Sequence, residues 1–277
     1  MLRLRAPATL AELCARGGGV VRGAAKVASV ARVEDAGEGD LAPLTSGRFA
    51  AKAKRAIARG AAILADEALG RDLDGPVWSH PHASWALAEV LDDCIAPMER
   101  PRWGEGCTFG DNVVLGPRVE IGARVHVEAG AVIGRPGFGW ATKDAVTRPV
   151  PQLGGVVIED DAWIGPLCTV DAGTLAPTRI RRGAKLDAHV HVGHNCDVGE
   201  ECIIAAQSGL AGSVVLGRGV LVGGQAGFAD HVRVGDGARI AAKSGVIGDV
   251  PAGAVVAGYP AQPRMRWLRA LARLYRR

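Results

Sequence analysis

Three of the chain's seven histidines, His189, His191 and His194, lie within six consecutive positions. A neutral imidazole can accept a proton from an attacking nucleophile, and three imidazoles together can bind Zn²⁺. The same residues on an exposed strand would be ordinary solvated side chains. Which chemistry is possible depends on where each side chain points, and therefore on the fold of the surrounding segment.

Large apolar residues recur at every sixth position through most of the chain. One series begins at Trp103, and a second runs from Ile158 to Val170. The longest uninterrupted series is Ile180, Leu186, Val192, Val198, Ile204, Leu210, Leu216, Val222, Phe228, Val234, Ile240 and Val246. Helices repeat near 3.6 residues and free strands at 2, so neither explains a step of six. The repeat predicts a left-handed parallel β-helix of hexapeptide type, whose coils stack at about 4.8 Å.

Smaller residues complete each hexad. Gly often follows the large residue, as at Gly165 and Gly193, where we expect it to turn the chain at a corner. Four cysteines occupy the small inward position and are predicted core residues: Cys107, Cys168, Cys196 and Cys202.

Composition excludes several classes of protein. The net charge of +4 and the scarcity of aromatic residues (4%) argue against a nucleic-acid binder. The opening segment lacks the apolar core of a signal peptide, and no stretch approaches the roughly 18 apolar residues that span a bilayer. We therefore expect a reduced, cytoplasmic protein without disulfides or a transmembrane segment.

The pattern predicts three regions. Residues 1–100 mix helical and strand periodicities and form a small α/β domain. Residues 101–258 form the β-helix, interrupted by a Pro/Gly-rich loop at residues 135–155. Residues 259–277 carry apolar residues at helical spacing among arginines, which predicts a short basic amphipathic helix.

Several long motifs resemble one family, the UDP-3-O-acylglucosamine N-acyltransferases of lipid A biosynthesis, which are hexapeptide-repeat acyltransferases. The motifs are KLDAHVHVGHN, PQLGGVVIEDDAWIGPLCTVDAGTL, GGQAGFADHVRVGDGARIAAKSGV, IGRPGFGWA and AGYPAQPRMRW. The resemblance implies a homotrimer that transfers a 3-hydroxyacyl chain from acyl carrier protein to the 2-amine of a UDP-sugar. It also implies that the N-terminal domain holds the uridine and that the basic helix docks the carrier. No metal or cofactor is implied beyond the carrier's phosphopantetheine.

Catalytic roles follow from this resemblance and from hexad position. His194 projects outward after inward Val192 and is the expected general base. Asp187, one hexad earlier, is expected to orient the imidazole, and a backbone N–H near Gly212 is the expected oxyanion donor. The residues expected to bind substrate are Asn195, His231, Phe138, Gly139, Phe49 and Ser46. His189 and His191 are expected to be bystanders.

Some positions depart from the family pattern and leave alternatives open. Pro136 stands where the family usually has Asp, Ala172 stands where Arg is usual, and the uridine-binding stretch keeps Phe49 but not the usual Asn. One alternative is an N-acyltransferase of another sugar nucleotide that uses acyl-coenzyme A. Another is a zinc enzyme like the γ-class carbonic anhydrases, since His189 and His194 have the ligand spacing of that class. The third is a non-catalytic scaffold.

Overall fold

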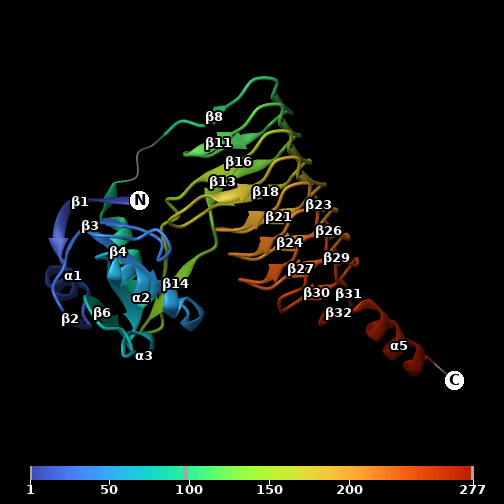
Figure 1. The fold of residues 1–277 in the computed structure, drawn as a ribbon. Coiled ribbons are helices and arrows are strands. Elements are labelled where there is room, and N and C mark those ends of the chain that lie inside the picture. Colours follow the sequence, from blue (N-terminus) through green and yellow to red (C-terminus); the bar gives the residue numbers. More distant parts are fainter. Residues whose placement is uncertain (1, 96–98, 276–277) are drawn as a thin grey trace. The chain divides into compact units, whose positions relative to one another are not determined.

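A computed structural model describes residues 2–95 and 99–275, which form two compact units (Figure 1). The first unit contains residues 2–95 together with Gly139–Leu153, and the second contains residues 99–138 and 154–275. The domain boundary predicted near residue 100 falls beside residues 96–98, which lie outside the described residues. The last two residues of the predicted basic helix, 276 and 277, lie outside them as well.

The first unit is an α/β domain built on a seven-stranded sheet of order β2-β6-β5-β4-β3-β1-β7. Its central strands, β3 to β6, are parallel, while β1 and β2 pair antiparallel with their neighbours. The elements are β1 (Leu2–Thr9), α1 (Leu10–Gly17), β2 (Val20–Arg22), β3 (Lys26–Val30), β4 (Asp40–Leu44), η1 (Gly47–Phe49), α2 (Ala50–Ala58), β5 (Ala62–Asp66), α3 (Glu67–Gly70), β6 (Val77–His80), α4 (Ala83–Asp92) and β7 (Cys94–Ile95). Thr9 and Glu12 form a reciprocal capping box that starts α1.

The interruption of the β-helix is a β-hairpin of β14 (Trp140–Lys143) and β15 (Val146–Pro149), and it belongs to the first unit. Arg148 on β15 holds it to α4. Its guanidinium lies 5.2 Å from the Trp85 ring centroid and forms ion pairs with Glu89 and Asp92. The predicted division, which gave residues 135–155 to the β-helix, differs from the structure because these contacts are all made with α4.

The second unit is a stack of coils, each crossing three parallel sheets in turn (Figure 1). Sheet I contains β8 (Arg102–Trp103), β11 (Val119–Ile121), β16 (Val156–Ile158), β19 (Thr178–Ile180), β22 (Asp197–Val198), β25 (Val215–Leu216) and β28 (Arg233–Val234). Sheet II contains β9 (Thr108–Phe109), β12 (His126–Val127), β17 (Trp163–Ile164), β20 (Lys185–Leu186), β23 (Ile203–Ile204), β26 (Leu221–Val222), β29 (Arg239–Ile240), β31 (Val255–Ala257) and β32 (Gln262–Pro263). Sheet III contains β10 (Val114–Leu115), β13 (Val132–Pro136), β18 (Thr169–Ala172), β21 (His191–Val192), β24 (Gly209–Leu210), β27 (Gly227–Phe228) and β30 (Gly245–Val246). The chain ends in helix α5 (Arg264–Leu274).

The six-residue repeat is confirmed as the repeat of inward positions. Ile180, Val198 and Leu216 lie in register on adjacent coils of sheet I and are almost completely buried. The first coil differs, since Trp103 is 56% exposed and Phe109 is 37% exposed. Their strands, β8 and β9, are the outermost strands of sheets I and II, so no described coil covers one side of them.

Glycine has two roles in the coils. Gly193 is required because a Cβ there would lie 2.8 Å from the Leu210 carbonyl oxygen of the next coil, and Gly165 is similarly crowded by Leu186. The left-handed turn falls two residues later, on glycines such as Gly219 (φ 65°) and on other residues such as Asn195 (φ 61°). Glycine directly after the inward residue therefore allows close stacking of coils, while Gly, Asn, His and other residues turn the corners.

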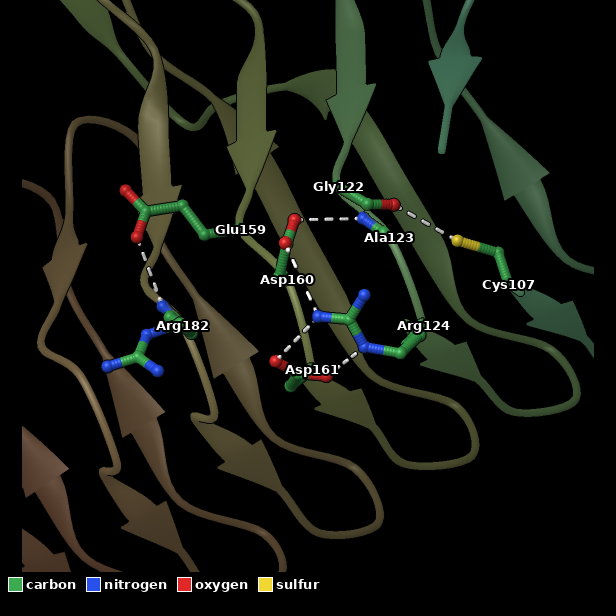
Figure 2. A network of polar contacts seen from close by, with 8 residues as sticks. All are labelled: Cys107, Gly122, Ala123, Arg124, Glu159, Asp160, Asp161 and Arg182. Atoms are coloured by element: carbon green, nitrogen blue, oxygen red, sulfur yellow. Dashed lines mark hydrogen bonds and ion pairs between the residues drawn. The ribbon is translucent and has the colours of Figure 1, made fainter. Parts of the chain in front are cut away.

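At several corners a carboxylate accepts a hydrogen bond from a backbone N–H that the strands leave unpaired. Figure 2 shows the corner between sheets I and II, where Asp160 Oδ1 accepts a hydrogen bond from Ala123 N at 2.9 Å. Arg124 Nε lies 2.7 Å from Asp161 Oδ1 on the next coil, and Glu159 accepts from Arg182 N. Each such contact ties one coil to its neighbour.

Three of the predicted core cysteines are fully buried, and each thiol donates to a backbone carbonyl of the following coil. Cys196 Sγ lies 3.0 Å from Ala211 O. Cys168 and Cys202 make the same contact. Burial raises the pKa of the Cys196 thiol to about 12 and the pKa values of the other two to about 11. Cys107, in the first coil, is only partly buried.

These thiols should resist alkylation in the folded protein. With iodoacetamide at pH 8, we expect rapid modification of partly buried Cys14 and none of Cys168, Cys196 or Cys202 until urea unfolds the chain, because the thiolate is the reactive species. Peptide mass spectrometry would measure this. Labelling of Cys196 at the rate of Cys14 would contradict the packed β-helix core.

Candidate active site

A groove with a cavity of ≈ 920 Å³ follows the outer face of sheet III. His191, Gly209, Gly227 and Gly245 occupy the outward position on four successive strands, in register. Three glycines in a row leave the backbone of sheet III as a floor without side chains. His194 lies at one end of this groove and Tyr259 at the other.

His194 occupies the corner after β21, and backbone holds its ring on two sides. A Cβ added at Gly137 would lie 2.5 Å from His194 Cβ and 3.0 Å from Cγ. A Cβ added at Gly212, on the next coil, would lie 2.6 Å from Cε1 and 2.7 Å from Nε2. The imidazole therefore packs directly against two glycines, with its Nε2 end beside the Gly212 backbone.

Asn195 fixes the orientation of this imidazole. Its Oδ1 lies 3.0 Å from His194 Nδ1 and also accepts from Thr174 Oγ1 at 2.8 Å. Because an amide oxygen only accepts hydrogen bonds, Nδ1 carries the proton and Nε2 keeps a lone pair. Asn195 was expected to bind substrate; in the structure its oxygen is used to position His194.

Asp187 does not orient His194, which corrects the prediction. It lies at the corner between sheets II and III, one corner earlier than His194. Its carboxylate accepts hydrogen bonds from Ala188 N at 2.7 Å and Ala206 N at 3.1 Å. A spacing of one hexad places two residues at successive corners of the triangle, so their side chains point away from each other.

Gly212, the expected oxyanion donor, lies next to the His194 ring. Its carbonyl accepts from His231 N at 2.9 Å. Its own N–H donates to no acceptor within residues 2–95 and 99–275. The oxyanion role of this N–H stays a prediction.

Sequence reasoning missed a cluster of charged groups at the His194 end of the groove. Asp171 is 1% exposed, and Arg135 Nε lies 2.7 Å from its Oδ1. His191 Nε2 lies 3.9 Å from Asp171 Oδ2, and His191 Nδ1 lies 2.7 Å from Thr169 Oγ1. Burial raises the pKa of the Asp171 carboxyl and lowers the pKa of the His191 imidazole.

His191, which was expected to be a bystander, lines the groove, whereas His189 lies at another corner, outside it. The sequence signal for this placement is the register of the repeat. His191 immediately precedes the inward residue Val192, just as Gly209 and Gly227 immediately precede their own inward residues. That position faces outward on the grooved sheet.

The remaining predicted residues divide between the two units. His231 and Phe138 line the groove with His194, and Phe138 is 77% exposed. Gly139 belongs to the first unit, as do Ser46 and Phe49. The Phe49 ring lies 5.0 Å from Lys52 Nζ and 5.3 Å from the Arg48 guanidinium. Uridine binding by these residues stays a prediction.

Two further observations concern metal binding and membrane crossing. Among the residues that the structure describes, no group of three His, Cys, Asp or Glu side chains could hold a metal ion. None of the helices in this part of the chain is both long and apolar enough to cross a bilayer.

Comparison with known proteins identifies the repeat. The model of the family "Bacterial transferase hexapeptide (six repeats)" matches residues 104–135 and 177–212. Over these residues the chain is similar to the hexapeptide transferases. The structure of LpxA from Acinetobacter baumannii is similar to this chain with a TM-score of 0.50 and 23% identity, over 64% of this chain and 74% of that one. This likeness confirms the left-handed β-helix fold.

Curated relatives confirm the resemblance seen in the sequence. A UDP-3-O-acylglucosamine N-acyltransferase of Caulobacter sp. is 40% identical over 151 residues, covering 54% of this chain and 44% of the relative. One from Anaeromyxobacter dehalogenans is 51% identical over 179 residues, covering 62% and 51%. The chain thus spans about half the length of the curated relatives it matches.

The contact between His194 and Gly212 can be tested without substrate. In Gly212→Ala the new methyl group would displace the imidazole, so the His194 ring signals in NMR spectra of ¹³C-histidine-labelled protein should shift. Gly227→Ala is the matched control, because a Cβ there meets nothing within 4 Å. His194→Gln would assign the signals. An unchanged His194 signal in Gly212→Ala would refute the packing described.

Proposed function

We propose that this chain is the N-acyltransferase that moves a 3-hydroxyacyl chain from acyl carrier protein to the 2-amine of UDP-3-O-acylglucosamine in lipid A biosynthesis. One observation carries the proposal: Asn195 holds Nδ1 of the His194 ring, and the Nε2 end of that ring lies beside the Gly212 backbone in a groove. The names of the curated relatives supply the substrate class.

The chemistry needs a base and an oxyanion donor, and both lie at this corner. The amine of the acceptor attacks the thioester carbonyl and forms the C–N bond, while His194 Nε2 takes its proton. The oxyanion of the tetrahedral intermediate accepts a hydrogen bond from Gly212 N–H. Collapse breaks the C–S bond, and the proton held by His194 passes to the departing thiolate of the phosphopantetheine arm.

The groove supports an extended acyl donor. Its glycine floor is open at Gly209 and Gly227, where an added Cβ would meet nothing within 4 Å, while the Tyr259 ring lies over Gly245. The open part spans one coil step, or about 5 Å, along the stack. His231 and Phe138 line the same cavity and are the residues proposed to contact substrate near the reacting centre.

We propose a cytoplasmic homotrimer with active sites between neighbouring β-helices. Apolar residues on the outer face of sheet II support assembly: Trp163 is 41% exposed, Ile203 49% and Leu221 37%. A groove on one face of each β-helix would then be completed by a neighbouring copy.

The base is tested with His194→Gln, assayed with UDP-3-O-acylglucosamine and 3-hydroxyacyl carrier protein. Loss of the proton acceptor should lower kcat by about 10²- to 10⁴-fold. His189→Gln is the matched control and should stay within about twofold of the wild type. The same assay with acyl-coenzyme A and with other amino sugar nucleotides tests the alternatives. Near-wild-type kcat in folded His194→Gln would sink the mechanism.

Helix α5 is the proposed docking site for the acidic carrier. Arg266, Arg269 and Arg273 are exposed, while Trp267 and Leu268 are half-buried. Opposite charges on two partners accelerate encounter and are screened by salt.

Reversing charge on α5 should weaken this encounter. Arg266→Glu with Arg269→Glu is expected to raise KM for the carrier by about three- to tenfold at low salt, with kcat unchanged and the effect fading at high salt. Arg3→Glu with Arg71→Glu makes the same change of charge in the first unit. Equal effects from both pairs would count against docking on α5.

A further inference from the structure

An ion pair connects two strands of sheet III beside His194. Arg135 on β13 and Asp171 on β18 are register partners, immediately after a β-bulge between Ile133 and Arg135. Arg135 Nε lies 2.7 Å from Asp171 Oδ1 but makes no hydrogen bond to it, and Arg135 Nη2 donates a hydrogen bond to Asp171 Oδ2 at 3.3 Å. Asp171 is 1% exposed and the Arg135 side chain 45%. A buried carboxylate is therefore neutralised by an arginine that reaches in from the groove.

Only Pro136 separates Arg135 from Gly137, and Gly137 packs on the His194 ring. Proline restricts the backbone on both sides of itself. Holding the Arg135 guanidinium against Asp171 therefore holds Gly137 against Cβ, Cγ and Cδ2 of His194. The β-bulge suits this role, since bulges redirect the chain next to active sites.

The other groups around Asp171 strengthen the arrangement. His191 lies 3.9 Å from its second carboxylate oxygen and is itself held by Thr169. Arg135, His191 and His194 each interact with Asp171, and each favours the ionised carboxylate when it carries a positive charge. The Cys196 thiol is a further titratable group close enough to interact with it. The carboxylate thus lies among three basic groups at the His194 end of the groove.

We propose that Arg135 and Asp171 are positioning residues for the general base: their ion pair clamps the segment from Arg135 to Gly137 onto the His194 imidazole. The carboxylate on which the base depends is then Asp171 and not Asp187. This inference rests on the proposed function for its kinetic consequence, but the clamp itself can be observed without turnover.

The kinetic test uses Asp171→Asn, Arg135→Gln and the double variant. A base displaced by about 1 Å costs up to about 100-fold in rate, so kcat should fall about 10- to 100-fold, with KM for both substrates within about twofold. The double variant should be no worse than the worse single variant, because both break one interaction. Arg135→Gln changes a half-exposed residue and keeps the test available if Asp171→Asn does not fold.

The matched control is Asp197→Asn, which breaks the Arg181–Asp197 pair on the outer face of sheet I. Arg181 Nε and NH2 both lie 2.7 Å from the Asp197 carboxylate, so an equally close pair is lost away from the groove. This variant should keep kcat within about twofold. A similar fall in kcat in Asp197→Asn would mean that loss of any such pair lowers activity, and would overturn the clamp.

The second readout is the His194 ring signal in ¹³C-histidine NMR spectra. It should be single and narrow in the wild type and should shift or broaden in Asp171→Asn and Arg135→Gln, but not in Asp197→Asn. If the wild type transfers no acyl group and the signal still responds, the proposed function fails and the clamp stands. If the enzyme is active and neither kcat nor the signal responds, the clamp is wrong.

Discussion

The structure depends on one constraint, the close stacking of each coil on the next with backbone hydrogen bonds between them. Ladder bonds such as Gly193 N to Leu210 O, 2.9 Å, recur from coil to coil. Stacking at this distance forces small residues into the positions where coils meet, as at Gly165 and Gly193. It also aligns equivalent side chains in columns, so that one residue type repeated in the sequence becomes a continuous surface in space.

The candidate site is a consequence of these columns. A column on sheet III runs from Val114 and Val132 through Thr169 and His191 to Gly209 and Gly227, so side chains give way to bare backbone after His191. This change in side-chain size creates the groove, and His191 marks the point along the column where the glycine floor begins. His194 sits in a neighbouring column, where Gly212 on the next coil leaves room for its ring. The His194 ring is held by backbone, so its position would cost little additional side-chain entropy if it is the proposed base.

The same geometry explains what sequence could and could not predict. A period of six predicts which residues point inward, and the fold, the buried cysteines and the outward position of His194 follow from it. It does not predict neighbours across coils, because these depend on the register left after the interruption at residues 137–155. Asp187 is close to His194 in sequence but lies at another corner, while Asp171 reaches the site from the preceding coil. The hairpin of β14 and β15 was also missed, since its partners are on α4, far away in the chain.

The corner donor beside His194 differs from two of its counterparts on other coils. Asp160 accepts a hydrogen bond from Ala123 N, and Asp236 accepts one from Arg218 N, one coil before it. Asp230 occupies the same position relative to Gly212, yet its side chain is 76% exposed and lies 4.0 Å from His231 Nε2. Other corner donors, such as the Gly224 N–H, also have no acceptor among the described residues, so the feature that distinguishes Gly212 is the His194 ring beside it. A carboxylate on Gly212 would stabilise the coil but would occupy the donor and repel an oxyanion, so an open donor is what the proposed chemistry requires there.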